Sequence, residues 1–232
     1  MIKKILTVSI SLLLTATSTL AAAEGNVSLG KTQAESCAGC HGADGNSPSG
    51  MFPKLAEQHA SYLIKQLNDF KQGRRNAPMM APLAMGLSDE QIQNIAAFYE
   101  SNKVKPNTSL PVMDFDDDDE DEMDEAAKKA AAEKKQAELD ELLAMGGDLY
   151  RNGDLEREVS ACIACHGPYG EGNKPAAFPA LRAQHADYLI KTLTDFKQGK
   201  RQNNSENMMR MIADGMTEEQ IKAVSYYISM MK

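Results

Sequence analysis

Two short stretches decide the fold of this chain: "SCAGCHGADGNS" at 36–47 and "ACIACHGPYGEGN" at 161–173. All four cysteines of the 232 residues lie in them, as two pairs separated by two residues, and a histidine follows each pair. The two pentapeptides contain Cys37, Cys40 and His41, and Cys162, Cys165 and His166. A C-x-x-C-H pattern admits three interpretations, which are zinc, disulfides and covalently attached haem.

The N-terminus indicates export. Lys3 and Lys4 precede a short apolar run that ends in three alanines at 21–23, the pattern of a secretory signal peptide with an A-x-A cleavage site. We predict a signal peptide at 1–23 and a mature chain that begins at Glu24 in a bacterial periplasm. An uncleaved membrane anchor is the alternative, although the run is short and rich in serine and threonine.

Haem explains every residue of the motif. A disulfide across two residues closes a very small loop and would constrain the unfolded chain little. Zinc needs four ligands, whereas each pentapeptide offers three at most and the copies stand about 120 residues apart. In a haem site the two thiols form thioethers with the porphyrin vinyl groups and the histidine ligates the iron. We therefore predict two covalently bound haem c groups, with His41 and His166 on the irons.

The chain contains an internal duplication. "FPKLAEQHASYLIKQLNDFKQGRR" at 52–75 matches "FPALRAQHADYLIKTLTDFKQGKR" at 178–201 without a gap. Apolar residues recur at helical spacing in both, and a glycine ends each segment. "LSDEQIQNIAAFYE" at 87–100 and "MTEEQIKAVSYYIS" at 216–229 each open with a capping box. There is no convincing alternation of apolar residues, so we predict an all-α fold with one haem-binding lobe per copy.

The duplication also selects the distal iron ligands. A histidine–methionine pair raises the haem potential and suits electron transfer, so methionines are the first candidates. Met80 precedes the cap residue Ser88 by eight positions, and Met209 precedes Thr217 by eight. Met79 and Met208 match in the same way and are the alternative pair. Three other methionines in these segments, Met85, Met211 and Met216, have no counterpart in the other copy. We predict Met80 and Met209 as the distal ligands.

Two further histidines are also twins. His59 and His185 stand in the polar contexts "EQHASY" and "AQHADY" at the start of a predicted helix. Ligation of both irons by two histidines is therefore an alternative. We expect a surface or helix-capping role for them instead.

These features together resemble the dihaem cytochrome c4 family. The resemblance rests on "CHGADGNSP", "FPKLAEQHASYLIKQL" and "LSDEQIQNIAAFY" and covers nearly all of both copies. It implies two tandem class I-like cytochrome c lobes, at 24–105 and 145–232. The family's covalent attachments fall on Cys37, Cys40, Cys162 and Cys165, its proximal ligands on His41 and His166, and its distal ligands on Met80 and Met209. The basic pairs at 74–75 and 200–201 would lie near haem propionates or on the surface.

The resemblance also implies a function. Members of the family are periplasmic electron carriers, soluble or membrane-associated, that pass electrons from a quinol-oxidising complex towards a terminal haem–copper oxidase. We expect no catalysis and no nucleic-acid partner. One alternative is the cytochrome subunit of a periplasmic redox enzyme, such as a sulfide-oxidising flavocytochrome. A dihaem peroxidase is another, although it needs a displaceable ligand where each lobe here offers a methionine.

One segment departs from the family, a linker at 106–144. Its part at 114–125 holds ten acidic residues in twelve positions, and 126–143 should form a solvated helix of Ala, Glu, Lys, Gln and Leu. Loss of Lys3 and Lys4 with the signal peptide takes the net charge from −8 to −10, so this run accounts for nearly all of it. The run Asp114–Glu125 is either a spacer or a docking arm for a basic redox partner. So long a linker leaves the packing of the lobes open.

Overall fold

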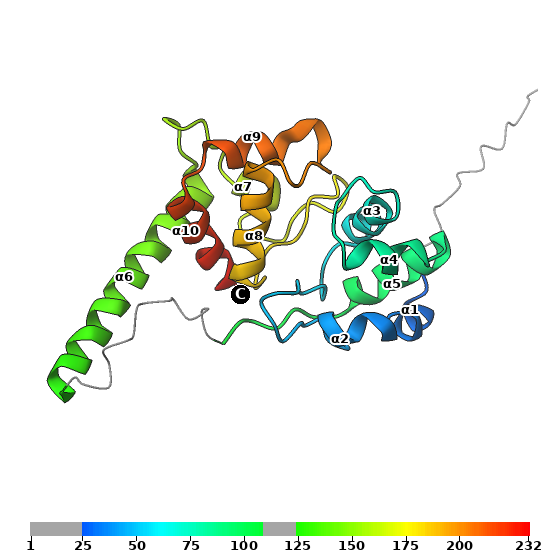
Figure 1. Cartoon of the computed structure of the whole chain (residues 1–232), viewed down its shortest axis with the longest axis horizontal. Coiled ribbons are helices and arrows are strands. Elements are labelled where there is room, and N and C mark those ends of the chain that lie inside the picture. The colour runs from blue at the N-terminus through cyan, green and yellow to red at the C-terminus, as the bar shows by residue number, and fades with distance from the viewer. Residues whose placement is uncertain (1–24, 109–123) are drawn as a thin grey trace, which may run out of the picture.

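In the computed structural model, which describes residues 25–108 and 124–232, two helical lobes lie side by side (Figure 1). The expected signal peptide and the acidic run as far as residue 123 lie outside the described residues. The N-terminal lobe contains α1 (Val27–Gln33), η1 (Glu35–Cys37), α2 (Ala38–His41), α3 (Ala60–Lys71), α4 (Met80–Met85) and α5 (Asp89–Ser101). The C-terminal lobe contains α6 (Glu125–Asn152), α7 (Ile163–His166), α8 (Ala186–Lys197), η3 (Ser205–Asn207), α9 (Met208–Gly215) and α10 (Glu218–Ser229).

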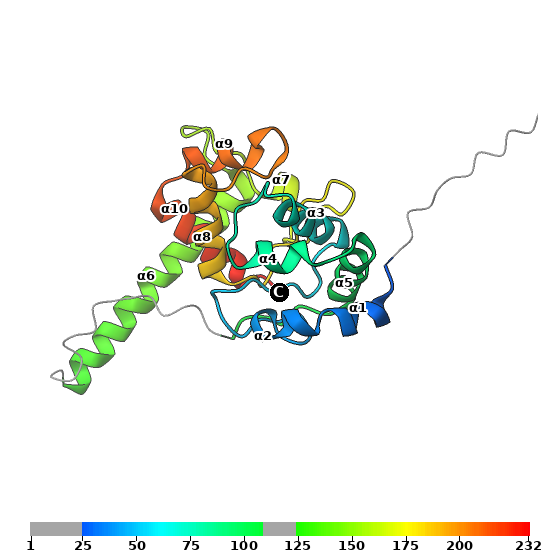
Figure 2. The ribbon, with the colours of Figure 1, turned by 45° about the vertical axis from the view of Figure 1, so that its right-hand side comes forward.

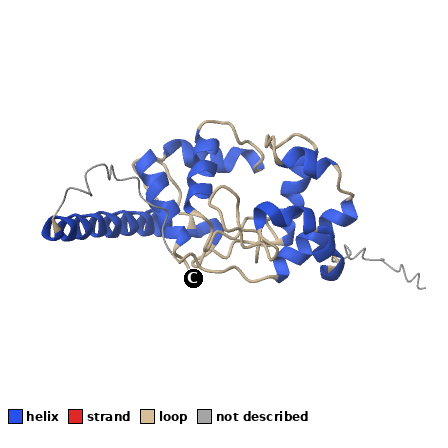
Figure 3. Ribbon diagram, turned by 60° about the horizontal axis from the view of Figure 1, so that its bottom comes forward, coloured by secondary structure: helices blue, strands red, loops and turns tan. Residues whose placement is uncertain are grey.

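The described parts of the chain hold helices and loops but no strand beyond two isolated bridges (Figure 3). The predicted all-α fold is confirmed. The predicted capping boxes are also present, at Ser88 with Gln91 and at Thr217 with Gln220. None of the helices in 25–108 and 124–232 combines the length and apolar character needed to cross a membrane.

The first and last helices of each lobe cross at a glycine. A Cβ atom built on Gly30 of α1 would stand 2.0 Å from the carbonyl oxygen of Asn94 in α5. The twin crossing places Gly146 of α6 against Ala223 of α10, where the same atom would stand 2.1 Å from the carbonyl oxygen. Because only glycine lets the backbones approach so closely, these positions fix how each lobe closes around its core.

Helix α6 joins the linker to the C-terminal lobe. It begins at the Asp124 cap and runs without interruption across the boundary expected at residue 144, and its N-terminal half protrudes from the lobe (green in Figure 1). The protruding part carries exposed i,i+4 ion pairs, which stabilise a helix only slightly. These are Lys129–Glu133 at 3.8 Å and Lys134–Glu138 at 3.7 Å. Only the C-terminal part of α6 packs, against α10.

The two lobes pack against each other through reciprocal hydrogen bonds. The amide of Gln58 pairs with the backbone of Ala180, donating to its oxygen and accepting from its nitrogen, both at 2.9 Å. The amide of Gln184 pairs in the same way with the backbone of Lys54, at 2.8 and 2.9 Å. All these contacts lie where the loops after the two C-x-x-C-H motifs meet between the lobes (cyan and yellow in Figures 1 and 2). The long linker therefore does not separate the lobes.

The twin histidines add a second reciprocal contact. His59 and His185 occupy the N-cap positions of α3 and α8, but their side chains cap neither helix. His59 Nε2 donates to the carbonyl of Glu171 at 2.7 Å, and His185 Nε2 donates to that of Ser47 at 2.9 Å. The expected surface or capping role of these side chains was wrong, because each of them links one lobe to the other.

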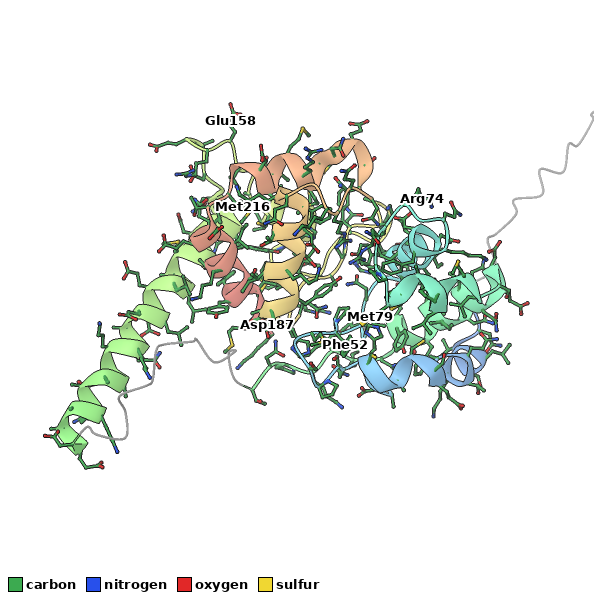
Figure 4. All side chains as sticks on the ribbon, in the orientation of Figure 1. Phe52, Arg74, Met79, Glu158, Asp187 and Met216 are labelled. Carbon is green, nitrogen blue, oxygen red and sulfur yellow. The ribbon has the colours of Figure 1, made fainter. Side chains whose placement is uncertain are left out.

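The basic pairs divide into exposed and interfacial members. Arg74 is exposed and pairs with Asp69 at 2.7 Å (Figure 4). The second residue of each pair instead reaches the other lobe. Arg75 donates to the Tyr188 hydroxyl at 3.1 Å, and Arg201 donates to the Tyr62 hydroxyl at 3.0 Å.

Candidate haem sites and the family they define

Each C-x-x-C-H motif forms a single helical turn. In the N-terminal lobe Cys37 ends η1, and α2 carries Cys40 and His41. In the C-terminal lobe Cys162 precedes α7, which carries Cys165 and His166. A spacing of three residues brings both thiols of a pair to one face of the turn. Cys37 and Cys162 pack against the apolar core of their lobes.

A glycine after each histidine turns the chain away from the motif. Gly42 has a φ of 79° and Gly167 a φ of 77°, in the region that favours glycine. A Cβ atom on Gly42 would also stand 2.6 Å from the carbonyl oxygen of Asn46. The following loop folds back over the histidine and brings a proline carbonyl to it in both lobes.

The proline carbonyls set the state of the two histidines. His41 Nδ1 donates to the carbonyl of Pro53 at 2.9 Å, and His166 Nδ1 donates to that of Pro179 at 3.0 Å. The proton on Nδ1 leaves Nε2 with a free lone pair, which is the form that ligates a metal. Both rings are buried, with 6% and 7% exposure, and burial lowers the pKa of both imidazoles, which keeps them neutral.

The methionines of the two lobes differ in their surroundings. Met80 begins α4 and is half-buried, and Met209 lies in the first turn of α9, where its N–H donates to Asn204 Oδ1 at 2.9 Å. Of the alternative pair, Met79 is 64% exposed and Met208 is half-buried. Met216 is buried in the core of the C-terminal lobe and therefore serves as apolar filling (Figure 4).

Sequence reasoning missed several residues around the motifs. Pro53 and Pro179 stand at matching positions in the two copies, directly after Phe52 and Phe178, and this repetition is the signal that could have found them. Tyr150 was missed as well. Its hydroxyl donates to the carbonyl of Gly167 at 2.6 Å, and burial raises its pKa, so it stays protonated.

The donor set fits haem better than the two alternatives. All four cysteines lie in the described residues and all are free thiols. Among the residues that the structure describes, no three histidine, cysteine or acidic side chains converge as ligands of a bare metal ion. Each lobe instead offers two thiols on one turn, a neutral imidazole with a free Nε2, and methionine side chains at the start of α4 or α9. A haem held there supplies one-electron exchange between ferrous and ferric iron.

Comparison with known proteins agrees with this donor set. The cytochrome c protein family matches the chain at 27–103 and again at 143–232, one match per lobe. Cytochrome c4 of Pseudomonas aeruginosa is 38% identical over 221 residues, which cover 94% of this chain and 96% of that protein. The chain belongs to the dihaem cytochrome c4 family. It is therefore an electron-transfer cytochrome with two covalent haem c groups that exchanges electrons with redox protein partners.

Two further relatives sharpen the comparison. The crystal structure of reduced recombinant cytochrome c4 from Pseudomonas stutzeri superimposes with a TM-score of 0.73 at 34% identity, covering 90% of this chain and all of that one. A thiosulfate dehydrogenase electron acceptor of Stutzerimonas stutzeri strain A1501 is 37% identical over 198 residues, 84% of this chain and 79% of that protein. The chain is thus similar both to a solved cytochrome c4 and to a protein named as the electron acceptor of a thiosulfate dehydrogenase.

Proposed function

We propose that this cytochrome c4 is a periplasmic electron carrier of a respiratory chain that passes electrons from a quinol-oxidising complex towards a terminal haem–copper oxidase. The observation that carries the proposal is the repeated histidine geometry, in which a proline carbonyl prepares Nε2 for iron in each lobe. The similarity to proteins named cytochrome c4 over nearly their whole length supports the same role. The chain is then a carrier and not an enzyme.

We assign the haem-binding residues by lobe. In the N-terminal lobe Cys37 and Cys40 form the thioethers, His41 is the proximal ligand and Met80 the distal one. In the C-terminal lobe the same roles fall to Cys162, Cys165, His166 and Met209. Two observations support the methionines: their matching registers in the two copies and their places in the first turns of α4 and α9.

The packing of the lobes supports a two-centre carrier. The Gln58 and Gln184 amides hold the loop behind one histidine motif against the loop behind the other. Lys54 and Ala180, their partners, each follow directly on the proline that orients a histidine. A fixed spacing of the two lobes is what electron exchange between two haems of one chain requires.

The maturation and division of the chain belong to the same proposal. A signal peptide at 1–23 would deliver the chain to the periplasm, where the haems would be attached. Lobes at 24–105 and 145–232 would then flank a linker at 106–144. The cytochrome would associate with the outer face of the membrane through its redox partners.

The test is reconstitution with purified components. Periplasmic protein should have the mass of the 24–232 chain plus two haem c groups and a low-spin spectrum in both redox states. The reduced protein should be oxidised by a terminal oxidase and re-reduced by a quinol-oxidising complex. A disulfide-bonded chain without haem, or a high-spin haem that turns over peroxide, would contradict the assignment.

A second candidate is the acceptor of a periplasmic sulfur-oxidising enzyme. The similarity to a thiosulfate dehydrogenase electron acceptor favours this role over other enzyme partners. Mixing the oxidised protein with a thiosulfate dehydrogenase and thiosulfate distinguishes the two roles. Reduction faster than by the quinol-oxidising complex would support the second candidate.

A further inference from the structure

The C-terminal lobe carries a segment without a counterpart in the N-terminal lobe. Between α1 and Cys37 there are three residues, 34–36. Between α6 and Cys162 there are nine residues, 153–161. This insertion is therefore a structural difference between the surfaces of the two lobes near their cysteine motifs.

The insertion is a well-fixed hairpin. The backbones of Asp154 and Val159 exchange two hydrogen bonds at 2.8 Å, and the Val159 side chain is buried in the lobe core. The Asp154 carboxylate accepts from the N–H groups of Glu156 and Arg157 and from Gln220 Nε2 of α10, the last at 2.7 Å. Because these hydrogen bonds fix the backbone of the hairpin, the exposed residues at its tip are held in one conformation.

The hairpin presents one large apolar side chain at its tip. Leu155 at its tip is 93% exposed, the highest exposure among the large apolar residues of the described chain. Next to the hairpin, a depression of about 510 Å³ opens towards α9, which contributes Met208, Met211 and Ile212. Met211 is 63% exposed. A leucine held rigidly in water adds nothing to the stability of the lobe, and burying it against a partner would stabilise a complex.

The depression adjoins the segments that hold the second haem. Ser160, in its wall, stands two residues before Cys162, and Met208 directly precedes Met209. A protein that covered this face would therefore stand close to the haem of the C-terminal lobe. This step rests on the proposed function, because it uses the assignment of Cys162 and Met209 as haem residues.

The rim of the face is acidic. Arg157 pairs with Asp154 at 3.9 Å, which neutralises both. Among the described residues, Glu156, Glu158 and Asp214 have no ion-pair partner, and Glu158 points outward from the hairpin (Figure 4). A complementary partner carries basic side chains around an apolar centre.

We propose that the hairpin at 153–160 and the adjoining face of α9 form the docking surface through which the C-terminal lobe exchanges electrons with a redox protein whose contact patch is apolar and rimmed by lysine and arginine. The N-terminal lobe lacks the hairpin and therefore lacks this surface. Electrons therefore pass between this chain and such a partner through the haem of the C-terminal lobe.

The test uses the full-length protein with both haems and a lysine-rich mitochondrial cytochrome c as the probe. Leu155→Ser should lower the second-order rate of electron exchange, measured by stopped flow at low salt, roughly tenfold. The matched control is Leu29→Ser, at an exposed leucine of α1, which should leave the rate unchanged. A Glu156→Lys, Glu158→Lys double variant should also slow exchange, with a difference that shrinks as salt is added. Oxidation by a small cobalt complex should be the same for all forms.

Two results would overturn the proposal. One is equal rates with the probe for wild type, Leu155→Ser and the charge variant at every salt concentration. The other is a wild-type dimer in sedimentation that Leu155→Ser dissociates, because the occupant would then be a second copy. Failure of the proposed function would appear separately, as the lack of two low-spin haems in the wild type before any partner is added.

Discussion

Replacing the Gln184 side chain tests whether the lobe interface stabilises the whole molecule. Gln184 is buried and its amide makes both hydrogen bonds to the backbone of Lys54, which is buried as well. Gln184→Ala removes the two partners and leaves a backbone N–H and a carbonyl without a protein partner. The linker remains intact, so the loss of stability comes from the interface and from one bond within the lobe, in which Gln184 Oε1 accepts from the N–H of His185 at 3.1 Å.

The size of the effect follows from these contacts. A hydrogen bond contributes about 0.5–1.5 kcal/mol net, and a buried polar group left without a partner costs about 1–3 kcal/mol. A cavity of about 10 Å³ adjoins Lys54, Gln58 and Gln184, which leaves room for roughly one water molecule to replace part of the lost bonding. We therefore expect Gln184→Ala to lower the free energy of unfolding by about 2–3 kcal/mol. Its twin Gln58→Ala should have a similar effect, because it makes the same two bonds to Ala180.

Urea unfolding followed by circular dichroism and by haem absorbance measures this loss. The matched control is Gln136→Ala on the exposed part of α6, which should change stability by less than about 0.5 kcal/mol. As the interface weakens, the two lobes should also begin to unfold in separate transitions. A change below about 0.5 kcal/mol for both Gln184→Ala and Gln58→Ala would refute the reasoning, since buried backbone groups cannot lose their partners without cost.

Three further predictions concern the haem ligands, acid stability and the linker. Met80→Ala should convert one haem to high spin and lower its potential, whereas Met79→Ala should leave the spectrum unchanged; the reverse result would place the distal ligand one residue earlier. The hydrogen bond from Lys105 lowers the pKa of Asp44 to about 2, below the value of about 3.9 in an unfolded chain, so the stabilisation is present above pH 4 and is lost as the pH falls towards 2. Asp44→Asn should accordingly lower the urea midpoint at pH 6 and have a much smaller effect at pH 2, and an equal effect at both would contradict this. Deleting Asp114–Glu125 should leave both haem spectra unchanged and slow exchange with a basic partner only at low salt, and stopped-flow rates that stay equal would make the run a spacer.

The sequence predicts the local parts of this molecule well. Helix period, capping boxes and the C-x-x-C-H turn depend on residues within a few positions of each other, and the structure has them where the patterns indicate. The Ser88 and Thr217 caps are examples, since both capping boxes are complete. Histidine orientation is different, because the bond from His41 to Pro53 joins residues twelve positions apart through a loop of irregular shape.

The sequence does not predict the contacts between the lobes. His59 and His185 repeat in both copies, but a repeated residue can serve the core, the surface or the interface equally well. Their Nε2 atoms reach the carbonyls of Glu171 and Ser47, which are more than a hundred positions away along the chain. Only the packing of the lobes brings these atoms together. A polar context therefore suggested a surface or capping role, which was wrong.

The interface has a form that duplication explains. Each lobe presents the same glutamine, histidine, arginine and tyrosine to the other, so the contacts of these four residues occur twice, as in a symmetric dimer of identical subunits. Once two such lobes are joined in one chain, either copy can change without the other. Gln66 accepts hydrogen bonds from both Arg75 and Arg201, whereas its counterpart in the second copy is Thr192. The hairpin at 153–160 is a larger departure of the same kind. The reciprocal contacts hold the two haem lobes in a fixed relative position. The surfaces away from the interface are free to differ between the lobes. One lobe can therefore acquire a partner that the other does not bind.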